Sequence, residues 1–174
     1  MMADPRLLGA PTMTNATPSG SPVPTPSPHP PSAPFPEACP APPAPYARHD
    51  RRSGLTDPWE PLYSHRGADA VWLGLWAAAP HANSRGFVHG GLLTALADNA
   101  MGMSCAQARG DGRPSLVTVN LAVDFVSTAR VGQWVEVRPS VIRTGSKLCF
   151  ATALVLADGK VCARANATFA MPAH

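Results

Sequence analysis

The sequence predicts an α+β fold in which an antiparallel β-sheet wraps around one long central helix. Three observations support this prediction: a segment of helix length that is apolar on nearly every side, four later segments in which apolar residues alternate, and short turn sequences between those segments. A helix without a polar face must be buried. One buried helix covered by strands that short turns connect is an α+β arrangement.

The proline distribution sets the expected domain boundary. The chain has 174 residues and 21 prolines, most of them before residue 51. This early stretch has few large apolar residues and no periodicity, so it cannot bury enough surface to offset the entropy of ordering. We therefore expect residues 1–54 to form a disordered proline-rich tail and residues 55–174 to form one folded domain.

The helix and the strand before it come first in the domain. Residues 70–78, AVWLGLWAA, are an apolar run of strand length, and the loop PHANSRGFVHGG follows at 80–91. Residues 92–108 combine good helix formers with small and apolar residues on nearly all sides. The turn sequence RGDGRP at 109–114 ends the predicted helix.

The period then changes to two, which predicts four strands. They span residues 116–126, 133–143, 147–157 and 160–171, with Asp158-Gly159 as a hairpin signal between the last two. Pro139 indicates an edge or a bulge in the second of them. Two sets of apolar residues are each expected to share one face of a strand: Val117, Val119, Leu121, Val123 and Phe125 in the first, and Leu148, Phe150, Leu154 and Leu156 in the third.

Composition excludes several functional classes. The net charge of +3 and the absence of a basic run argue against nucleic acid. No segment reaches the length of a membrane helix, and the N-terminus lacks a signal-peptide pattern. The four cysteines have neither CxxC pairs nor zinc-like spacing, so we expect a cytoplasmic protein without a metal site. They are Cys39, Cys105, Cys149 and Cys162.

Two features of the helical region are candidates for chemistry. Asp98 lies mid-helix among apolar residues, and aspartate is rarely buried unless it is paired or functional. A local hydrogen bond or a carboxylate at the sheet edge is the structural alternative. His89-Gly90-Gly91 stands where the loop meets the helix, where unpaired first amides suit an oxyanion. A plain glycine turn before the helix is the alternative there.

The spacing of these two features constrains how they act. Gly90 precedes Asp98 by eight residues, or about 12 Å along a helix. A carbonyl held by the Gly90 amide therefore cannot also meet Asp98 of the same chain, because attack needs roughly 3 Å. If both act on one substrate, Asp98 comes from a second subunit. Two-fold symmetry then creates two identical sites, so the chemistry requires a dimer.

The segment HANSRGFVHGGLLTALADNAMG at 81–102 resembles the PaaI-like branch of the hotdog-fold acyl-CoA thioesterases. That family has an Asn six residues before the His of HGG and an Asp nine residues after it, which are here Asn83, His89 and Asp98. The segments at 117–132 and 143–169 look like later strands of the same family. The resemblance covers about residues 55–171. One departure is Thr128, where relatives commonly have a proline.

The resemblance implies hydrolysis of an acyl-CoA thioester to the free acid and coenzyme A. The Gly90 amide would hold the oxyanion and Asn83 would help to position the carbonyl. Asp98 of the partner would be the general base for water or a nucleophile. His89 would lie near the sulfur, and Thr118 would orient the water. A thiolate leaves readily, so one carboxylate and one oxyanion donor can suffice without a triad or a metal.

The resemblance also implies where coenzyme A binds, and no cofactor is expected because coenzyme A is part of the substrate. The implied phosphate contacts are Arg130, Arg143, Gly145, Ser146 and Lys147, with Gly91 beside the oxyanion donor. The expected assembly is a homodimer that pairs into a dimer of dimers. Whether that pairing occurs, which acyl group is bound and whether Asp98 is base or nucleophile all stay open at this point.

Two other functions are compatible with the fold. A 3-hydroxyacyl thioester dehydratase or hydratase would use a His with an acid, but the proline-rich segment that usually follows that His is missing here. A non-catalytic acyl-CoA-binding module is the second alternative. Asn83, Gly90 and Asp98 together favour the thioesterase. The tail is also compatible with docking to a partner.

Overall fold

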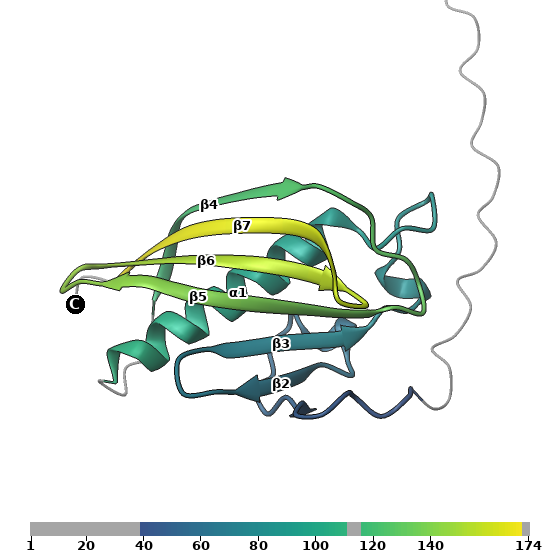
Figure 1. Ribbon diagram of the computed structural model, residues 1–174, viewed down its shortest axis with the longest axis horizontal. Coiled ribbons are helices and arrows are strands. Elements are labelled where there is room, and N and C mark those ends of the chain that lie inside the picture. Colours follow the sequence, from purple (N-terminus) through teal and green to yellow (C-terminus); the bar gives the residue numbers. More distant parts are fainter. Residues whose placement is uncertain (1–38, 111–115, 172–174) are drawn as a thin grey trace, which may run out of the picture. The chain divides into compact units, whose positions relative to one another are not determined.

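The computed structural model describes residues 39–110 and 116–171. Within them, seven strands form one antiparallel sheet, and a single α-helix packs against one of its faces (Figure 1). The strand order is β1-β2-β3-β5-β6-β7-β4. The strands are β1 (Ala47–Arg48), β2 (Tyr63–Arg66), β3 (Val71–Trp76), β4 (Val117–Phe125), β5 (Trp134–Thr144), β6 (Leu148–Ala157) and β7 (Lys160–Ala170).

The predicted order of one strand, one helix and four strands is confirmed for β3, α1 and β4 to β7. The helix α1 spans Gly90–Arg109, and short 3₁₀ turns lie at Asp57–Trp59 and Ala79–His81. His89 caps the start of α1, because its Nδ1 accepts a hydrogen bond from the Gly91 amide. Gly110 ends the helix in the left-handed region at a φ of 66°, a conformation that glycine adopts without steric cost.

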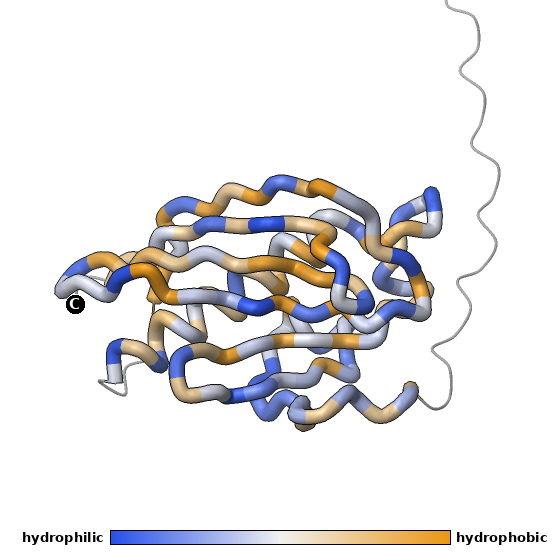
Figure 2. Tube along the Cα trace, in the orientation of Figure 1, coloured by the Kyte–Doolittle hydropathy of each residue, from blue (hydrophilic) through white to orange (hydrophobic). Residues whose placement is uncertain are grey.

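Small residues on the inner face of the sheet let α1 lie close to it. On β6 and β7 the residues facing the helix are Cys149, Ala151, Ala153, Val155, Ala163, Ala165 and Ala167, all buried. Hydrophobic and hydrophilic residues alternate along the strands in Figure 2. Leu148, Phe150 and Leu154 share a face as predicted, but that face is exposed and points away from the helix. Leu156, the fourth residue of the predicted set, is instead buried after the register shift at Val155. The larger apolar residues of β6 therefore lie outside the main core.

A bulge in β4 breaks the single apolar face that the alternation predicts. The pairing between β4 and β7 shifts register between Thr118 and Asn120. Leu121 pairs with the buried Ala167 and faces the core, whereas Val117 pairs with Ala170 beyond the bulge. The expectation of one uninterrupted face in β4 is therefore wrong, because the extra residue inverts the alternation.

Part of the predicted tail belongs to the folded domain. Residues 47–48 form β1 and pair with β2, and the His49 amide donates to the Leu62 carbonyl at 2.9 Å. The Tyr46 hydroxyl donates to Glu136 Oε2 at 2.7 Å, with its ring edge-on to Trp134. The expected boundary at residue 55 is thus too late, because one aromatic anchor and a short edge strand suffice to hold this segment. Residues 1–38 lie outside the described residues.

Two further observations concern the environment of the chain. None of the helices in residues 39–110 and 116–171 combines the length and apolarity that a membrane crossing requires. The four cysteines are free thiols, and Cys105, Cys149 and Cys162 are buried. Burial raises the pKa of the Cys162 thiol, so it behaves as a small apolar core residue.

Candidate active site

Asp98 lies on the side of α1 that faces β4, where its carboxylate has a defined partner. The Thr118 hydroxyl donates to Asp98 Oδ1 at 2.8 Å. Asp98 is half-buried, so the helix has a partly open face in the single chain instead of being enclosed on every side. This hydrogen bond joins Asp98 and Thr118, two predicted site residues that are twenty residues apart in the sequence.

The bulge in β4 explains why Thr118 points toward the helix. Thr118 pairs with Phe169, which is buried on the inner face of β7, whereas Asn120 pairs with Thr168 on the opposite face. Strict alternation would place Thr118 and Asn120 on the same face. The inserted residue places the Thr118 hydroxyl on the helix side, and this geometry produces the hydrogen bond to Asp98.

The start of α1 presents one unpaired amide. The Gly91 amide donates to His89 Nδ1 at 2.9 Å, so it is already occupied. The Gly90 amide donates to no acceptor among the described residues. Because the helix dipole adds partial positive charge there, the Gly90 N–H is the better oxyanion donor of the two. Gly91 was expected to contact substrate, and its amide is committed to the cap in this structure.

The hydrogen bond that His89 Nδ1 accepts from the Gly91 amide also fixes the tautomer of a neutral His89 ring. A neutral imidazole has one N–H, and Nδ1 is the acceptor from Gly91, so the proton lies on Nε2. The His89 side chain is exposed, and its backbone amide donates to the His81 carbonyl at 2.9 Å. The ring can therefore donate a hydrogen bond from Nε2 to a group bound beside the helix start.

Asn83 shapes the loop that leads to the helix. Its Oδ1 accepts from the Arg85 amide at 2.9 Å and from the Phe87 amide at 3.3 Å. The Asn83 amide donates to the Phe87 carbonyl at 2.7 Å, which closes the turn. The carboxamide oxygen is thus used within the loop, which leaves the Nδ2 group as the part of Asn83 that can donate to a ligand.

The expected phosphate contacts lie at opposite ends of α1. The Arg130 guanidinium stacks 4.7 Å from the Phe87 ring, close to the start of the helix. Gly145 lies at the other end, where its carbonyl accepts from Arg109 Nη1 at 2.9 Å. Exposed Arg143, Ser146 and Lys147 flank Gly145. Because α1 has 20 residues and is roughly 30 Å long, the two groups cannot bind the same phosphate within one chain.

A pocket beside Asp98 includes a residue that the sequence reasoning missed. Its volume is about 120 Å³, and its lining includes Asp98, Thr118, Asn99, Met103 and Arg51. Arg51 falls within the predicted tail, where the sequence indicates no site residue. The available signal was the cluster of polar and basic residues HDRR at 49–52, which follows the last proline of the early proline-rich run.

Two buried histidines give the domain a predicted pH dependence. Burial lowers the pKa of both His49 and His81, partly opposed by the nearby Asp50 carboxylate at His49 and by a backbone hydrogen bond of Trp59 at His81. Below the ordinary histidine pKa the unfolded chain therefore binds more protons than the folded chain. We expect the free energy of unfolding to be highest above about pH 6.5 and to fall as the pH decreases below that value.

Urea denaturation at pH 7.5, 6.5 and 5.5 measures this effect. His49→Gln removes one of the two titrating groups, so its free energy of unfolding should fall less steeply over the same range. A wild-type free energy that stays constant or rises on acidification would contradict the prediction.

The chain is similar to several known proteins. The family model described as Thioesterase superfamily matches residues 85–163, which include Gly90, Asp98 and Thr118. A Pseudomonas aeruginosa protein named Putative esterase PA0474 is 36% identical over 123 residues, which are 70% of this chain and 91% of that protein. Acyl-coenzyme A thioesterase 13 of Mus musculus is 28% identical over 74 residues, 41% of this chain and 50% of that protein.

A solved structure shows the same arrangement of helix and sheet. The phenylacetic acid degradation-related protein of Ralstonia eutropha superposes with a TM-score of 0.61 at 25% identity. The match covers 70% of this chain and 92% of that protein.

Proposed function

This chain belongs to the thioesterase superfamily and adopts the PaaI-like hotdog fold, and from that premise we propose that it hydrolyses acyl-CoA thioesters to the free acid and coenzyme A. Thioester hydrolysis is the activity of the superfamily. The observation that carries the more specific proposal is the Asp98 carboxylate, held by Thr118 on a helix whose first amide is unpaired. The name of the mouse relative, an acyl-coenzyme A thioesterase, supports the substrate class.

The proposed reaction needs few groups because a thioester is already activated. The Gly90 amide donates to the thioester oxygen and stabilises the oxyanion that forms on attack. Asp98 accepts a proton from a water molecule that Thr118 helps to orient, and the water oxygen bonds to the carbonyl carbon. Collapse of the tetrahedral intermediate breaks the carbon–sulfur bond. His89 Nε2–H can donate to the departing thiolate of coenzyme A.

Gly90 and Asp98 act in this scheme from two different subunits. Within one α1 they are about 12 Å apart along the helix axis, too far for both to reach one carbonyl carbon. A second α1 running antiparallel to the first would bring the Asp98 of one protomer to the Gly90 of the other. The partly open face of α1 around Asp98 supports this arrangement.

The free edge of β4 supports the same dimer. Among the described strands, β4 pairs only with β7 and ends the sheet. Val117, Val119 and Phe125 of this strand are 54%, 61% and 53% exposed, which is high for apolar residues of a nine-residue strand. An exposed apolar edge strand favours pairing with another strand. Antiparallel pairing of two β4 edges around a two-fold axis would also set the two α1 helices antiparallel.

A dimer would also reunite the expected coenzyme A contacts. The antiparallel helices would place Arg130 of one subunit at the same end of the assembly as Arg143 and Lys147 of the other. We propose that these groups share the phosphates of one coenzyme A.

Pairing of dimers is a further proposal, for which the exposed Leu148, Phe150 and Leu154 offer apolar surface. The free cysteine thiols support a reducing, cytoplasmic location.

Release of free thiol from a panel of acyl-CoA substrates tests the function. Purified full-length protein is incubated with short-chain, medium-chain and aromatic acyl-CoAs while thiol and enoyl absorbance are followed. We expect thiol release that depends on Asp98 and no enoyl absorbance. Binding without thiol release would indicate an acyl-CoA-binding module, and enoyl absorbance without thiol would indicate a dehydratase.

The role of Asp98 as base or nucleophile is decided by labelled water. In a single turnover in H₂¹⁸O, a general base directs labelled water onto the acyl carbon, so the acid product contains the label. A nucleophilic Asp98 forms an anhydride with the acyl group, and water then attacks the Asp98 carbonyl. The first acid product then takes its new oxygen from the enzyme and is unlabelled.

A further inference from the structure

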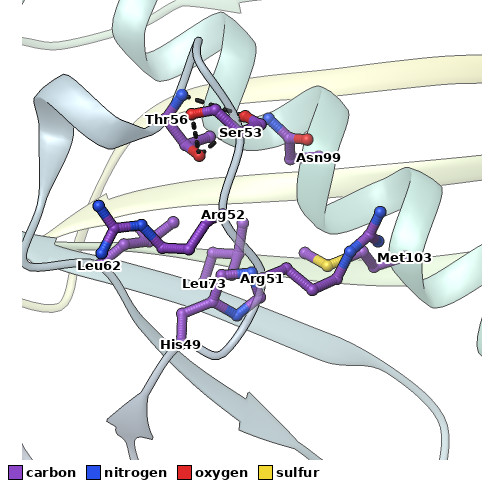
Figure 3. Close-up of a pocket in the computed structure, with 9 residues that line it drawn as sticks. All are labelled: His49, Arg51, Arg52, Ser53, Thr56, Leu62, Leu73, Asn99 and Met103. Carbon is purple, nitrogen blue, oxygen red and sulfur yellow. Dashed lines mark hydrogen bonds between the residues drawn. The ribbon is translucent and has the colours of Figure 1, made fainter.

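A second pocket lies beneath the segment that crosses α1, residues 49–56. Its volume is about 50 Å³, and it lies between this segment, Leu62 and Leu73 of the sheet side, and Asn99 and Met103 of α1 (Figure 3). One end of the segment is anchored by the hydrogen bond from the His49 amide to the Leu62 carbonyl, and the other end forms a local turn in which the Ser53 hydroxyl lies 2.9 Å from the Thr56 hydroxyl.

This pocket continues the pocket that contains Asp98. The two share Arg51, Asn99 and Met103 in their linings. Met103 follows Asp98 by five residues, which is about 7.5 Å along the helix axis. An extended chain of about six carbons with its terminal group covers most of that length, so an acyl group of this size whose carbonyl lies at Asp98 would reach the second pocket.

Arg51 places an uncompensated positive charge in both pockets. It has no ion pair or hydrogen bond to any described residue, and Figure 3 shows its side chain extending toward Met103. The adjacent Arg52 differs, because its Nε lies 2.8 Å from Asp57 Oδ1 and 3.6 Å from Glu60 Oε1. The charge of Arg52 is thus neutralised within the chain, whereas the charge of Arg51 is available to a ligand.

His49 adds an unsatisfied polar atom to the same pocket. Its side chain lines the pocket and the residue is only 6% exposed. Nδ1 is buried without a hydrogen-bond partner, and the closest carboxylate oxygen, on Asp50, is 4.0 Å away. A buried polar atom is normally paired, and this one is free to form a hydrogen bond with a group bound in the pocket. Burial lowers the pKa of His49, and the neutral ring can still donate one hydrogen bond.

We propose that the substrate's acyl group ends in a carboxylate that Arg51 and His49 bind, so that the enzyme prefers ω-carboxyacyl thioesters of about six carbons over plain acyl thioesters of equal length. The proposal rests on the proposed thioesterase activity. The same two side chains are also suited to a phosphate, which coenzyme A contains. The volume of about 50 Å³ suits a carboxylate better than a nucleotide, and the experiment separates the two sources.

The test compares adipyl and hexanoyl thioesters, which have equal carbon counts and differ in the terminal group. Each acyl group is offered on coenzyme A and on N-acetylcysteamine, which lacks the phosphates. We expect wild-type kcat/KM to be roughly ten- to hundredfold higher for adipyl than for hexanoyl on both carriers. Arg51→Met should abolish this preference, because kcat/KM should fall much further for adipyl than for hexanoyl on both carriers, whereas Arg51→Lys should retain part of the preference.

Arg164→Met is the matched control. It also removes one arginine, but Arg164 is on the other face of the sheet and pairs with Asp124. It should leave the preference intact. Two results would overturn the proposal: a wild-type enzyme that hydrolyses hexanoyl as well as adipyl thioesters, or an Arg51→Met loss of similar size for both acyl groups and confined to coenzyme A. The latter would assign Arg51 to the phosphates.

A binding measurement separates this proposal from the proposed activity. Calorimetric titration of Asp98→Asn, with and without Arg51→Met, measures the affinity for adipyl-CoA and hexanoyl-CoA without turnover. Tighter binding of adipyl-CoA that depends on Arg51 would support the pocket even if no thioester were hydrolysed. If the wild-type enzyme hydrolyses both thioesters but Asp98→Asn binds them with equal affinity, the proposed activity is supported and the carboxylate pocket is refuted.

Discussion

Replacing Asp98 with asparagine is expected to lower kcat for acyl-CoA hydrolysis by roughly 10²- to 10⁴-fold, the range for loss of an acid–base group. Asparagine has nearly the same shape and its Oδ1 can still accept from the Thr118 hydroxyl, so the local structure should persist. It can neither accept the proton of water nor form an anhydride. Steady-state thiol release measures the loss, and circular dichroism checks the fold.

Thr118 supplies the matched comparison. Thr118→Val keeps the branched shape and removes the hydroxyl that donates to Asp98, whereas Thr118→Ser keeps the donor. The valine variant should lose activity by less than Asp98→Asn, because the carboxylate is still present, and the serine variant should retain most of it. An Asp98→Asn enzyme that folds and keeps near-normal kcat would refute the assigned role of this carboxylate.

Replacing Gly90 with proline is expected to lower kcat by about 10²- to 10³-fold, the usual effect of removing one oxyanion donor. Proline is tolerated at the first position of a helix, and the preceding His89 already has the extended conformation that proline requires. The main structural change is therefore loss of the amide hydrogen. Thiol release at saturating acyl-CoA measures kcat.

Gly90→Ala controls for the added side chain. A Cβ at Gly90 would lie 3.1 Å from Cζ of Phe125, so both variants displace this half-exposed ring slightly. Only the proline variant lacks the N–H group. The alanine variant should thus retain most of the activity. Equal losses in the two variants would indicate that the Phe125 contact, and not the oxyanion donor, explains the effect.

Mixing the two inactive variants tests the shared site. After subunit exchange, half of the dimers contain one Asp98→Asn and one Gly90→Pro subunit, and each such dimer has one site with both groups intact. About a quarter of the wild-type activity should return. No recovery, with exchange shown by a tag on one subunit, would place both groups of a working site in a single chain.

Local patterns were sufficient for most of the fold. The apolar surround of residues 92–108 predicted the helix, because helix formers and the 3.6-residue period act between neighbours in the chain. The alternation in 116–126 and 147–157 predicted β4 and β6 within two residues. The interval between Gly90 and Asp98 is fixed by helix geometry, so the distance between the two groups also followed from sequence alone.

The short strands near the N-terminus could not be predicted in the same way. The two residues of β1 have too few positions to show a period, and they follow a proline-rich run that is typical of disorder. Their order depends on Tyr46 reaching Glu136, 90 residues away. Arg51 falls in the predicted tail for the same reason. Its place beside Asn99 and Met103 of α1 depends on the Tyr46–Glu136 hydrogen bond, which links this segment to the sheet.

The sequence by itself determined α1, β3 and the four strands β4 to β7, together with the single-helix α+β class and the family. Only the tertiary structure decided which face of a strand a site residue occupies and which other side chains it meets. The bulge in β4 directs Thr118 to Asp98, the two ends of α1 separate Arg130 from Arg143, and the folded N-terminal segment brings Arg51 to the Asp98 pocket. The physical reason is the range of the interactions. Periodicity and capping act over a few residues, whereas strand register and packing join segments that are far apart in the chain.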